Sequence, residues 1–280
     1  MKLLGEVLKA ATEYLEKKGI EKARREVEEL FAHVLRCKRL DLYLQFDRPL
    51  SEEEVGLMRE KVQRRASKEP LQYILGNVEF FGVKLDVSRA VLIPRNETEE
   101  LSSWVAQDLR ERKEGVLWDI CCGAGPLGLS LKKALPDFTV VMSDVSSQAL
   151  EVARDNAKKN GLKVLVREGD LLTPFHGEKA DVIVCNPPYI SKQEYDRLDS
   201  SVKDYEPKSA LIGGEDGLLF YKRLALEVKN FLRPGGRIYL EIGELQGAAV
   251  SALFSSDLWK TKIVKKDLSQ KDRFFFVENE

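Results

Sequence analysis

Apolar residues recur at helical spacing through the first part of the chain, up to about residue 67. The clearest set follows the i, i+3, i+4, i+7, i+8 pattern of one helix face and comprises Val27, Leu30, Phe31, Val34 and Leu35. Gly19 is suited to end a first helix, and Ser51 with Glu54 forms a capping box that begins a third. The pattern predicts a small helical bundle over residues 1–70.

The pattern changes after residue 70 to short runs rich in β-branched and aromatic residues. These runs cover 73–75, 78–81 and 83–87, and Gly76 and Gly82 separate them. Glycine punctuation between such runs is typical of tight turns. We therefore expect a β-hairpin linker over residues 71–94.

From residue 95 to residue 280, runs typical of buried strands alternate with amphipathic helical stretches. The strand runs cover 116–120, 139–144, 163–168, 181–186 and 236–243. Such alternation favours parallel strands joined by helical crossovers, hence a doubly wound α/β sheet. Ligands of these sheets bind at the carboxyl ends of the strands, so candidate chemistry is sought there.

Charge and composition exclude several classes of protein. The 280 residues carry 45 Lys and Arg against 46 Asp and Glu, a balance that gives no bulk field to hold a polyanion. The run Lys61, Arg64, Arg65 and Lys68 is accordingly interpreted as a solvated helix face rather than a binding patch. We expect no direct binding of nucleic acid.

The N-terminal sequence and the cysteines indicate a cytoplasmic protein. Charge at Glu6 and Lys9 interrupts the apolar stretch that a signal peptide needs, and no segment approaches the ~18 apolar residues of a spanning helix. The four cysteines form no CxxC pair, and with two histidines in the chain no zinc-ligand spacing occurs. We expect reduced thiols, no metal, no membrane and a monomer.

A glycine-rich loop follows the strand run at 116–120. Gly123, Gly125 and Gly128 match G-x-G-x-x-G, a turn that lets a nucleotide approach the backbone, although a tight turn without a ligand has the same pattern. The next strand run ends at Asp144, where a carboxylate can accept hydrogen bonds from ribose hydroxyls or cap the helix that starts near Ser146. A dinucleotide-dependent dehydrogenase and an S-adenosylmethionine-dependent methyltransferase both remain open.

The strand run at 181–186 leads directly into Asn186, Pro187, Pro188 and Tyr189. A residue before proline is extended, and the prolines have no N–H to donate, so this segment is rigid and rich in acceptors. The side-chain oxygen of Asn186 and nearby carbonyls can accept both hydrogens of a planar NH₂ group beside the Tyr189 ring. The segment favours methylation of an amide or a base amino group, although Pro-Pro can also be an ordinary end to a strand.

These motifs, in their order along the chain, resemble the HemK/PrmC family, the protein-(glutamine-N5) methyltransferases of class-1 peptide chain release factors. The resemblance covers nearly the whole chain. Its pieces are Gln72–Gly76, Ile93–Arg95 with Glu97–Glu99, the glycine loop, Asp144, Asn186–Tyr189, Glu206–Pro207 with Ala210–Leu211, Gly213–Leu218, Pro234–Gly236, and Glu241–Gly243 with Gln246. Adenine-N6 methyltransferases share Asn-Pro-Pro-Tyr, but the 95–99 and 213–218 segments are more characteristic of the glutamine enzymes.

The resemblance implies a class I methyltransferase fold, Rossmann-like and mostly parallel with an antiparallel C-terminal hairpin, and a substrate-recognition role for residues 1–70. It implies that S-adenosyl-L-methionine binds and leaves as S-adenosyl-L-homocysteine. The residues around its methionine portion would be Cys121, Cys122, Gly123, Ala124 and Gly125. Asp144 would hold its ribose, Leu171 would lie against its adenine, and Asn186 would also contact the cofactor. The segment from Asn186 to Tyr189 would hold the target glutamine.

The chain departs from the family pattern at two places. The family usually has Gly-Thr at Cys121-Cys122 and Pro at Asn96. A side chain at Cys121 is expected to crowd the cofactor if its φ is negative. This departure is the one feature that favours a binding protein without catalysis.

The implied reaction is methyl transfer to the side-chain nitrogen of the glutamine in a Gly-Gly-Gln motif, which would modulate translation termination. Asn186 and the Pro187 carbonyl would orient the amide, and Tyr189 would complete the catalytic set. The alternative is an adenine-N6 methyltransferase acting on DNA or RNA, which would need a charged channel. A dehydrogenase leaves Asn-Pro-Pro-Tyr unexplained and lacks a well-placed histidine.

Overall fold

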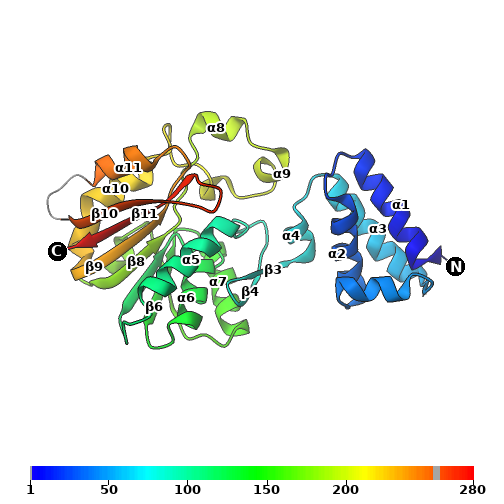
Figure 1. The fold of residues 1–280 in the computed structure, drawn as a ribbon, viewed down its shortest axis with the longest axis horizontal. Coiled ribbons are helices and arrows are strands. Elements are labelled where there is room, and N and C mark those ends of the chain that lie inside the picture. Colours follow the sequence, from blue (N-terminus) through cyan, green and yellow to red (C-terminus); the bar gives the residue numbers. More distant parts are fainter. Residues whose placement is uncertain (1, 255–258) are drawn as a thin grey trace. The chain divides into compact units, whose positions relative to one another are not determined.

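The computed structural model describes residues 2–254 and 259–280. The chain forms two compact units (Figure 1). The N-terminal unit contains the chain up to Gly76 together with residues 200–205, and the C-terminal unit contains residues 77–199 and 206–280. The first unit therefore includes a short segment that is distant in sequence.

The N-terminal unit is a helical bundle around one apolar core. Its elements are β1 (Lys2–Leu3), α1 (Leu4–Lys17), α2 (Ala23–Leu35), a 3₁₀ helix (Arg39–Gln45), β2 (Pro49–Leu50), α3 (Glu52–Ala66) and α4 (Leu71–Leu75), joined by α9 (Ser200–Lys203). Leu8, Val27, Phe31 and Met58 are among its fully buried side chains. The predicted capping box of α3 is confirmed, because Ser51 Oγ accepts from Glu54 N at 3.1 Å.

The predicted strand at 73–75 is wrong, because Leu71–Leu75 is the short helix α4. Pro70 precedes the first turn, and Gly76 ends the helix at φ 78°, where its N–H donates to Gln72 O at 2.8 Å. The rest of the predicted hairpin is confirmed, since β3 (Asn77–Phe80) and β4 (Val83–Asp86) pair antiparallel. A short apolar run such as 73–75 does not distinguish a strand from a buried helical turn.

The cations of α3 are not a solvated face. Arg64 forms two 2.9 Å hydrogen bonds with Glu69, and Arg65 Nε lies 2.5 Å from Glu26 Oε2. Lys61 Nζ donates to the carbonyl of Ile74 at 3.1 Å, and burial lowers its pKa. These partly buried side chains connect α3 to α2 and α4.

The C-terminal unit is built on a seven-stranded sheet in the order β10-β11-β9-β8-β5-β6-β7. Five strands are parallel: β5 (Val116–Ile120), β6 (Thr139–Asp144), β7 (Leu165–Glu168), β8 (Ala180–Cys185) and β9 (Leu232–Glu241). The C-terminal strands β10 (Trp259–Lys266) and β11 (Asp272–Asn279) are antiparallel to their neighbours. The expected mostly parallel sheet with an antiparallel C-terminal hairpin is confirmed.

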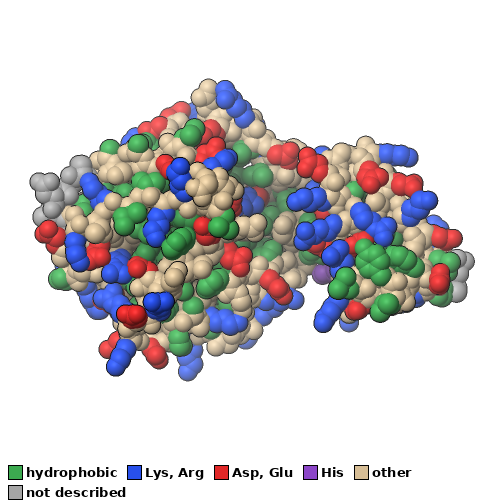
Figure 2. All heavy atoms as spheres, viewed as in Figure 1, with side chains coloured by type: hydrophobic (Ala, Val, Ile, Leu, Met, Phe, Trp, Pro, Cys, Tyr) green, Lys and Arg blue, Asp and Glu red, His purple; other side chains and the backbone are tan. Residues whose placement is uncertain are grey.

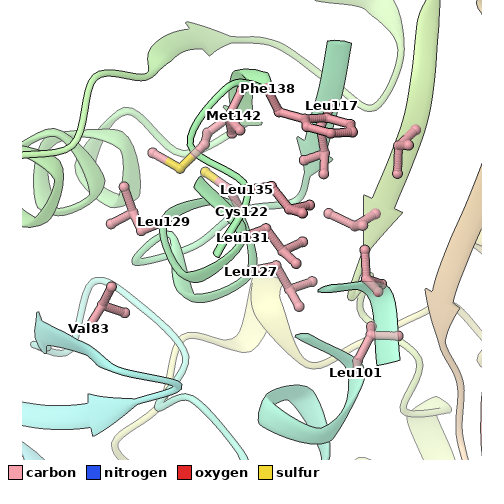
Figure 3. Close-up of a cluster of buried hydrophobic side chains, with 14 of the residues drawn as sticks. Val83, Leu101, Leu117, Cys122, Leu127, Leu129, Leu131, Leu135, Phe138 and Met142 are labelled. Atoms are coloured by element: carbon pink, nitrogen blue, oxygen red, sulfur yellow. The ribbon is translucent and has the colours of Figure 1, made fainter. Parts of the chain in front are cut away.

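Helices cover both faces of the sheet because each central strand is apolar on both sides. One face packs against α5 (Asn96–Asp108), α6 (Pro126–Ala134) and α7 (Ser147–Lys159), and Figure 3 shows part of this core around Leu117 and Met142. The other face packs against α10 (Leu219–Glu227) and α11 (Gly247–Leu253). Leu117 and Trp118 point to opposite cores, as neighbouring strand residues must.

The topology fixes where a ligand site can form. From β5 the chain adds β6 and β7 on one side, and it then returns to add β8 on the other side. The strand order therefore reverses between β5 and β8, where parallel α/β sheets bind ligands at the carboxyl ends. The loop after β5, Asp144 after β6 and Asn186 after β8 all lie at this edge.

The segment after β8 contains α8 (Lys192–Asp196), and α9 follows it as part of the N-terminal unit. Within that unit the hydroxyl of Tyr205 donates to the carbonyl of Ser67 at 2.7 Å. On the face drawn in Figure 2, Lys and Arg side chains are interspersed with Asp and Glu. Among residues 2–254 and 259–280, none of the helices has the length and apolar content to cross a membrane.

Gly128 lies where α6 packs closely against the sheet. A Cβ at Gly128 would lie 2.7 Å from Met142 Cγ and 2.9 Å from Asp119 Oδ2, so Gly128→Ala should destabilise the C-terminal unit by about 1–3 kcal/mol. Urea unfolding followed by tryptophan fluorescence measures this, because all three tryptophans lie in that unit. Gly56→Ala is the control, since its Cβ meets open space on α3, and it should not lower this transition.

Candidate functional site

The loop after β5 adopts a backbone conformation that favours glycine at two positions. Gly123 and Gly125 have φ values of 53° and 85°, in the left-handed region that favours glycine. Gly128 packs directly on Met142 and donates its N–H to Asp119 Oδ2 at 2.7 Å. The predicted turn and the close helix packing are both present.

Cys121 corrects an expectation, because its φ is +60° and not negative. The left-handed conformation costs a non-glycine residue about 1–2 kcal/mol, and it changes the direction of Cβ. The thiol lies beside Cys185 and packs against the core on the α10 side of the sheet. The crowding that a negative φ would produce therefore does not arise, although Cys121 still lines the cavity beside it.

Asp144 joins the glycine loop to the following helix. Its Oδ2 accepts from Gly123 N and its Oδ1 from Ser146 N, both at 2.9 Å. The alternative that Asp144 caps α7 is wrong, since Ser146 is the N-cap and its Oγ accepts from Ala149 N at 3.2 Å. Burial raises the pKa of Asp144, and the backbone N–H groups of Gly123, Val145 and Ser146 oppose that effect.

Two neighbouring cavities open at this edge of the sheet. The larger, of about 190 Å³, is lined by Cys121, Gly123, Asp144, Leu171, Asn186 and Pro188, among others. The smaller, of about 40 Å³, shares Cys121, Gly123 and Asn186 and adds Cys122, Ala124, Thr98 and Asp119. Gly125, Pro187 and Tyr189 line neither cavity. The structure therefore brings most of the predicted site residues around one space.

Leu171 lies on the floor of the larger cavity, buried to 6% exposure and at a φ of +50°. The preceding Asp170 forms two hydrogen bonds with Arg223 of α10, at 3.0 and 2.7 Å. This ion pair and the core on the α10 side hold the turn in place. Leu171 thus gives the cavity an apolar surface.

The glycine-rich run from Gly213 to Leu218 packs against the segment that contains Pro188 and Tyr189. A Cβ at Gly213 would lie 2.5 Å from the carbonyl oxygen of Pro188, and one at Gly217 would lie 2.4 Å from that of Tyr189. The Gln246 side chain donates to Tyr189 O at 2.9 Å and to Gly217 O at 3.2 Å. These contacts explain why glycines and Gln246 accompany the Asn-Pro-Pro-Tyr segment.

A hydrogen-bonded network lies beneath Asn186. Its Nδ2 donates to Thr98 Oγ1 at 3.1 Å, and Thr98 donates to Glu241 Oε2 at 2.6 Å. The Tyr189 hydroxyl donates to Glu241 Oε1 at 3.2 Å. The protein therefore holds Nδ2 of Asn186, and the residue lines both cavities.

Sequence reasoning assigned no role to four buried acceptors and donors at the site: Thr98, Asp119, Glu206 and Glu241. Glu206 accepts from Ile93 N at 3.0 Å and from Arg95 at 2.6 Å, which fixes the chain before α5. Asp119 lies within the apolar strand β5, and Glu241 follows the apolar run 238–240 at the end of β9; an acid next to apolar strand residues is the signal that could have found them. Asn96, the departure from the family's proline, lies at the first position of α5, where proline also fits.

Asp119 is the most strongly perturbed acid of the loop. Its side chain is buried, and Oδ1 has no hydrogen-bond partner among the described residues. Burial, with a smaller contribution from the nearby Asp144, raises its pKa to about 8 against the opposing effect of the Gly128 N–H. An orphaned carboxyl oxygen beside a cavity favours a cationic ligand group there.

Comparison with known proteins identifies both parts of the chain. The family described as the PrmC N-terminal domain matches residues 6–76, and the methyltransferase small domain matches residues 94–201. The release factor glutamine methyltransferase of Chlamydia trachomatis serovar L2 is 40% identical over 275 residues, 98% of this chain and 93% of the relative. The protein of that name from Bacillus cereus is 36% identical, over 98% of this chain and 99% of the relative.

Solved structures share the fold at low sequence identity. The methyltransferase of Pyrococcus furiosus has a TM-score of 0.52 at 16% identity, with 82% of this chain and 98% of that chain covered. The catalytic domain of hMettl16 has a TM-score of 0.56 at 18% identity, with 82% of each chain covered. The expected class I S-adenosylmethionine-dependent methyltransferase fold is confirmed.

The buried Asp119 carboxyl predicts how the stability of the ligand-free protein depends on pH. Its folded pKa of about 8 exceeds the unfolded value, so the folded state binds the extra proton and loses stability as the pH rises from about 4 to 8. Asp119→Asn should remove this contribution, which amounts to as much as about 1.4 kcal/mol per pH unit. Urea unfolding from pH 5 to 9 measures it, and Asp155→Asn, exposed on α7, should keep the wild-type slope.

Proposed function

Because the chain belongs to the family of release factor glutamine methyltransferases, we propose that it methylates class-1 peptide chain release factors. The acceptor is the side-chain amide nitrogen, N5, of the glutamine in their Gly-Gly-Gln motif. The methyl donor is S-adenosyl-L-methionine, which leaves as S-adenosyl-L-homocysteine. The observation that carries this proposal is an Asn186 amide whose nitrogen is held internally and whose oxygen remains for the substrate.

The residues around the glycine loop fit the methionine portion of S-adenosylmethionine. Asp119 Oδ1 is a buried acceptor without a partner among the described residues, and the ammonium group of the ligand supplies the hydrogens that it lacks. The loop from Cys121 to Gly125 presents the backbone, and nothing lies within 4 Å of a Cβ built at Gly123. Asp119 and Asp144 together favour a ligand of positive charge.

The other end of the cavity fits the nucleoside. Asp144 stands at the carboxyl end of β6, where its carboxylate can accept hydrogen bonds from ribose hydroxyls. Leu171 provides an apolar surface for the adenine. The bound ligand supplies an electrophilic methyl group on a sulfonium, so the protein has to orient the acceptor and exclude water.

Asn186 and Pro187 orient the target amide in this proposal. Two acceptors, Asn186 Oδ1 and the Pro187 carbonyl, take the two hydrogens of the glutamine NH₂ group. An amide nitrogen is a poor nucleophile because its lone pair is delocalised into the carbonyl. Acceptors on both hydrogens direct that lone pair toward the methyl group and stabilise positive charge as it develops on nitrogen.

Tyr189 contributes its ring and not a base. Burial and the neighbouring Glu241 raise the pKa of its hydroxyl, so it stays protonated and donates to Glu241. Its ring provides an aromatic wall beside the amide, with Pro188 next to it in the chain. The methylated amide releases its extra proton without help from a base, because a protonated amide nitrogen is strongly acidic.

Recognition of the factor is assigned to the helical region 1–70. The match to the PrmC N-terminal domain supports this assignment. So does an apolar groove of about 560 Å³ between α1 and α3, lined by Val7, Ala11, Tyr14, Met58 and Val62 among others. Apolar grooves of this kind are typical of surfaces that bind a partner protein.

The substrate class is tested with S-adenosylmethionine labelled in its methyl group. We expect label to enter a class-1 release factor and not duplex DNA or single-stranded RNA. A release factor with its Gly-Gly-Gln glutamine changed to alanine is the matched control and should remain unlabelled. Label in nucleic acid alone would instead establish the adenine-N6 alternative.

Two substitutions separate orientation of the amide from binding of the cofactor. Asn186→Ala should lower kcat by about 10²–10³-fold and leave the Kd of S-adenosylmethionine little changed, because it removes an acceptor used in the transition state. Asp144→Ala should weaken that Kd by about 10–100-fold through the lost ribose hydrogen bonds. Calorimetry gives the Kd, and the methylation assay gives kcat.

The control for both is Asp155→Ala, which removes an exposed carboxyl from α7. It should change neither kcat nor Kd. Equal losses of kcat and affinity in Asn186→Ala would contradict the orienting role. An unchanged affinity in Asp144→Ala would remove the ribose assignment.

A further inference from the structure

The network beneath Asn186 joins three elements that are far apart in sequence. Thr98 lies in the first turn of α5, Asn186 follows β8, and Glu241 ends β9. Thr98 and Glu241 are 2% and 1% exposed, so water does not replace their hydrogen bonds. The proposed function explains Asn186, but it leaves open why a carboxyl is buried behind it.

The direction of each hydrogen bond follows from the number of hydrogens available. An ionised carboxylate only accepts, so the single hydrogen of the Thr98 hydroxyl goes to Glu241 Oε2, at 2.6 Å. The Thr98 oxygen then has only lone pairs to offer Asn186. Asn186 must therefore turn its Nδ2 toward Thr98, at 3.1 Å, and its Oδ1 away.

This direction matters because the two ends of an asparagine amide have nearly the same shape. A rotation of 180° about the last side-chain bond exchanges an acceptor for a donor. A substrate NH₂ group needs an acceptor, so the rotated amide would repel it. The Asn-Pro-Pro-Tyr segment by itself does not select one orientation.

Resting on the proposed function, we propose that Thr98 and Glu241 are positioning residues that lock the Asn186 amide with its oxygen toward the substrate. Neither touches the reacting atoms. Glu241 sets the direction of the Thr98 hydroxyl, and Thr98 sets the direction of the amide. Glu241 also accepts from the Tyr189 hydroxyl at 3.2 Å, so one carboxylate orients both ends of the segment.

The surroundings of Glu241 make this lock sensitive to pH. Arg273 of β11 favours the carboxylate, Glu97 of α5 opposes it, and the hydroxyl of Tyr221 donates to its backbone carbonyl at 2.8 Å. Burial is the largest influence and raises the pKa of Glu241 to about 7. The carboxylate is thus ionised above about pH 7 and protonated below it.

Protonation of Glu241 allows the hydrogen bond between Glu241 and Thr98 to reverse its direction. A protonated Glu241 can donate to the Thr98 oxygen, which frees the Thr98 hydrogen to point at Asn186. The amide is then no longer required to present its oxygen to the substrate. Loss of activity should follow as the pH falls through about 7, with no change in the charge of the glutamine substrate.

The test uses the full-length protein, S-adenosylmethionine and a release factor, with three variants on the network. Thr98→Val keeps the shape but removes the hydroxyl, Thr98→Ser restores a hydroxyl, and Glu241→Gln removes the titrating carboxyl. Ser102→Ala is the matched control, since it removes another buried, hydrogen-bonded hydroxyl of α5 outside the site. The Kd of S-adenosylmethionine is measured for each variant.

We expect the wild-type kcat to fall about tenfold from pH 8 to pH 6, the change that one group of pKa near 7 produces. Thr98→Val should lower kcat at pH 8 by about tenfold or more, leave the Kd little changed and lose the inflection near pH 7. Thr98→Ser should recover most of kcat together with the inflection. Glu241→Gln should also lack the inflection, and Ser102→Ala should retain it.

A second measurement needs neither the cofactor nor methyl transfer. In ¹⁵N-labelled protein without added ligand, the side-chain NH₂ resonances of Asn186 should titrate near pH 7 in the wild type and in Thr98→Ser. They should not titrate in Thr98→Val. This readout isolates the lock from the chemistry.

The outcomes separate this inference from the proposed function. No methyl transfer by the wild-type protein would overturn the proposed function, and the inference with it. Wild-type transfer combined with wild-type kcat and pH profile in Thr98→Val would overturn the inference alone. An inflection retained in Glu241→Gln would overturn it too, as would an Asn186 NH₂ signal that does not titrate in the wild type.

Discussion

The buried carboxyl of Glu241 is the interaction on which the arrangement of the site depends. A carboxylate in the interior is costly unless hydrogen bonds satisfy it, and here the hydroxyls of Thr98 and Tyr189 do so at 2.6 and 3.2 Å. Those donors come from α5 and from the segment after β8, while Glu241 itself ends β9. Satisfying one buried acid therefore fixes three chain segments relative to one another.

The Asn-Pro-Pro-Tyr segment shows why a short motif needs so much of the chain around it. Two prolines make it rigid, but they also remove the N–H groups that would anchor it. The carbonyl of Tyr189 instead accepts a hydrogen bond from Gln246, and the close approach of Gly213 and Gly217 leaves no room for a Cβ. The glycines and Gln246 are therefore part of the same structural feature as the prolines, although they lie far along the sequence.

Electrostatics divides the site into two regions of different character. Around the glycine loop, the buried Asp119 lies near the partly buried Asp144, and burial raises the pKa of both, which favours a ligand with a positive group. Around Asn186, the groups offered to a ligand are neutral acceptors on a rigid backbone. A cationic methyl donor and a neutral amide acceptor would each meet the environment that suits it.

Local sequence determined the parts that depend on neighbouring residues. The strands at 116–120 and 139–144, the capping box at Ser51 and the glycine loop follow from hydrophobic period and turn chemistry, which act over a few residues. Prediction from local sequence failed at Leu71–Leu75, where a short apolar run fits either a strand or a helical turn. It also failed for the cations of α3, because their hydrogen-bond partners lie on other elements. Only the tertiary structure decided that Cys121 adopts a left-handed φ and that Thr98 meets Glu241 across 143 positions, because such contacts arise where strands and helices pack.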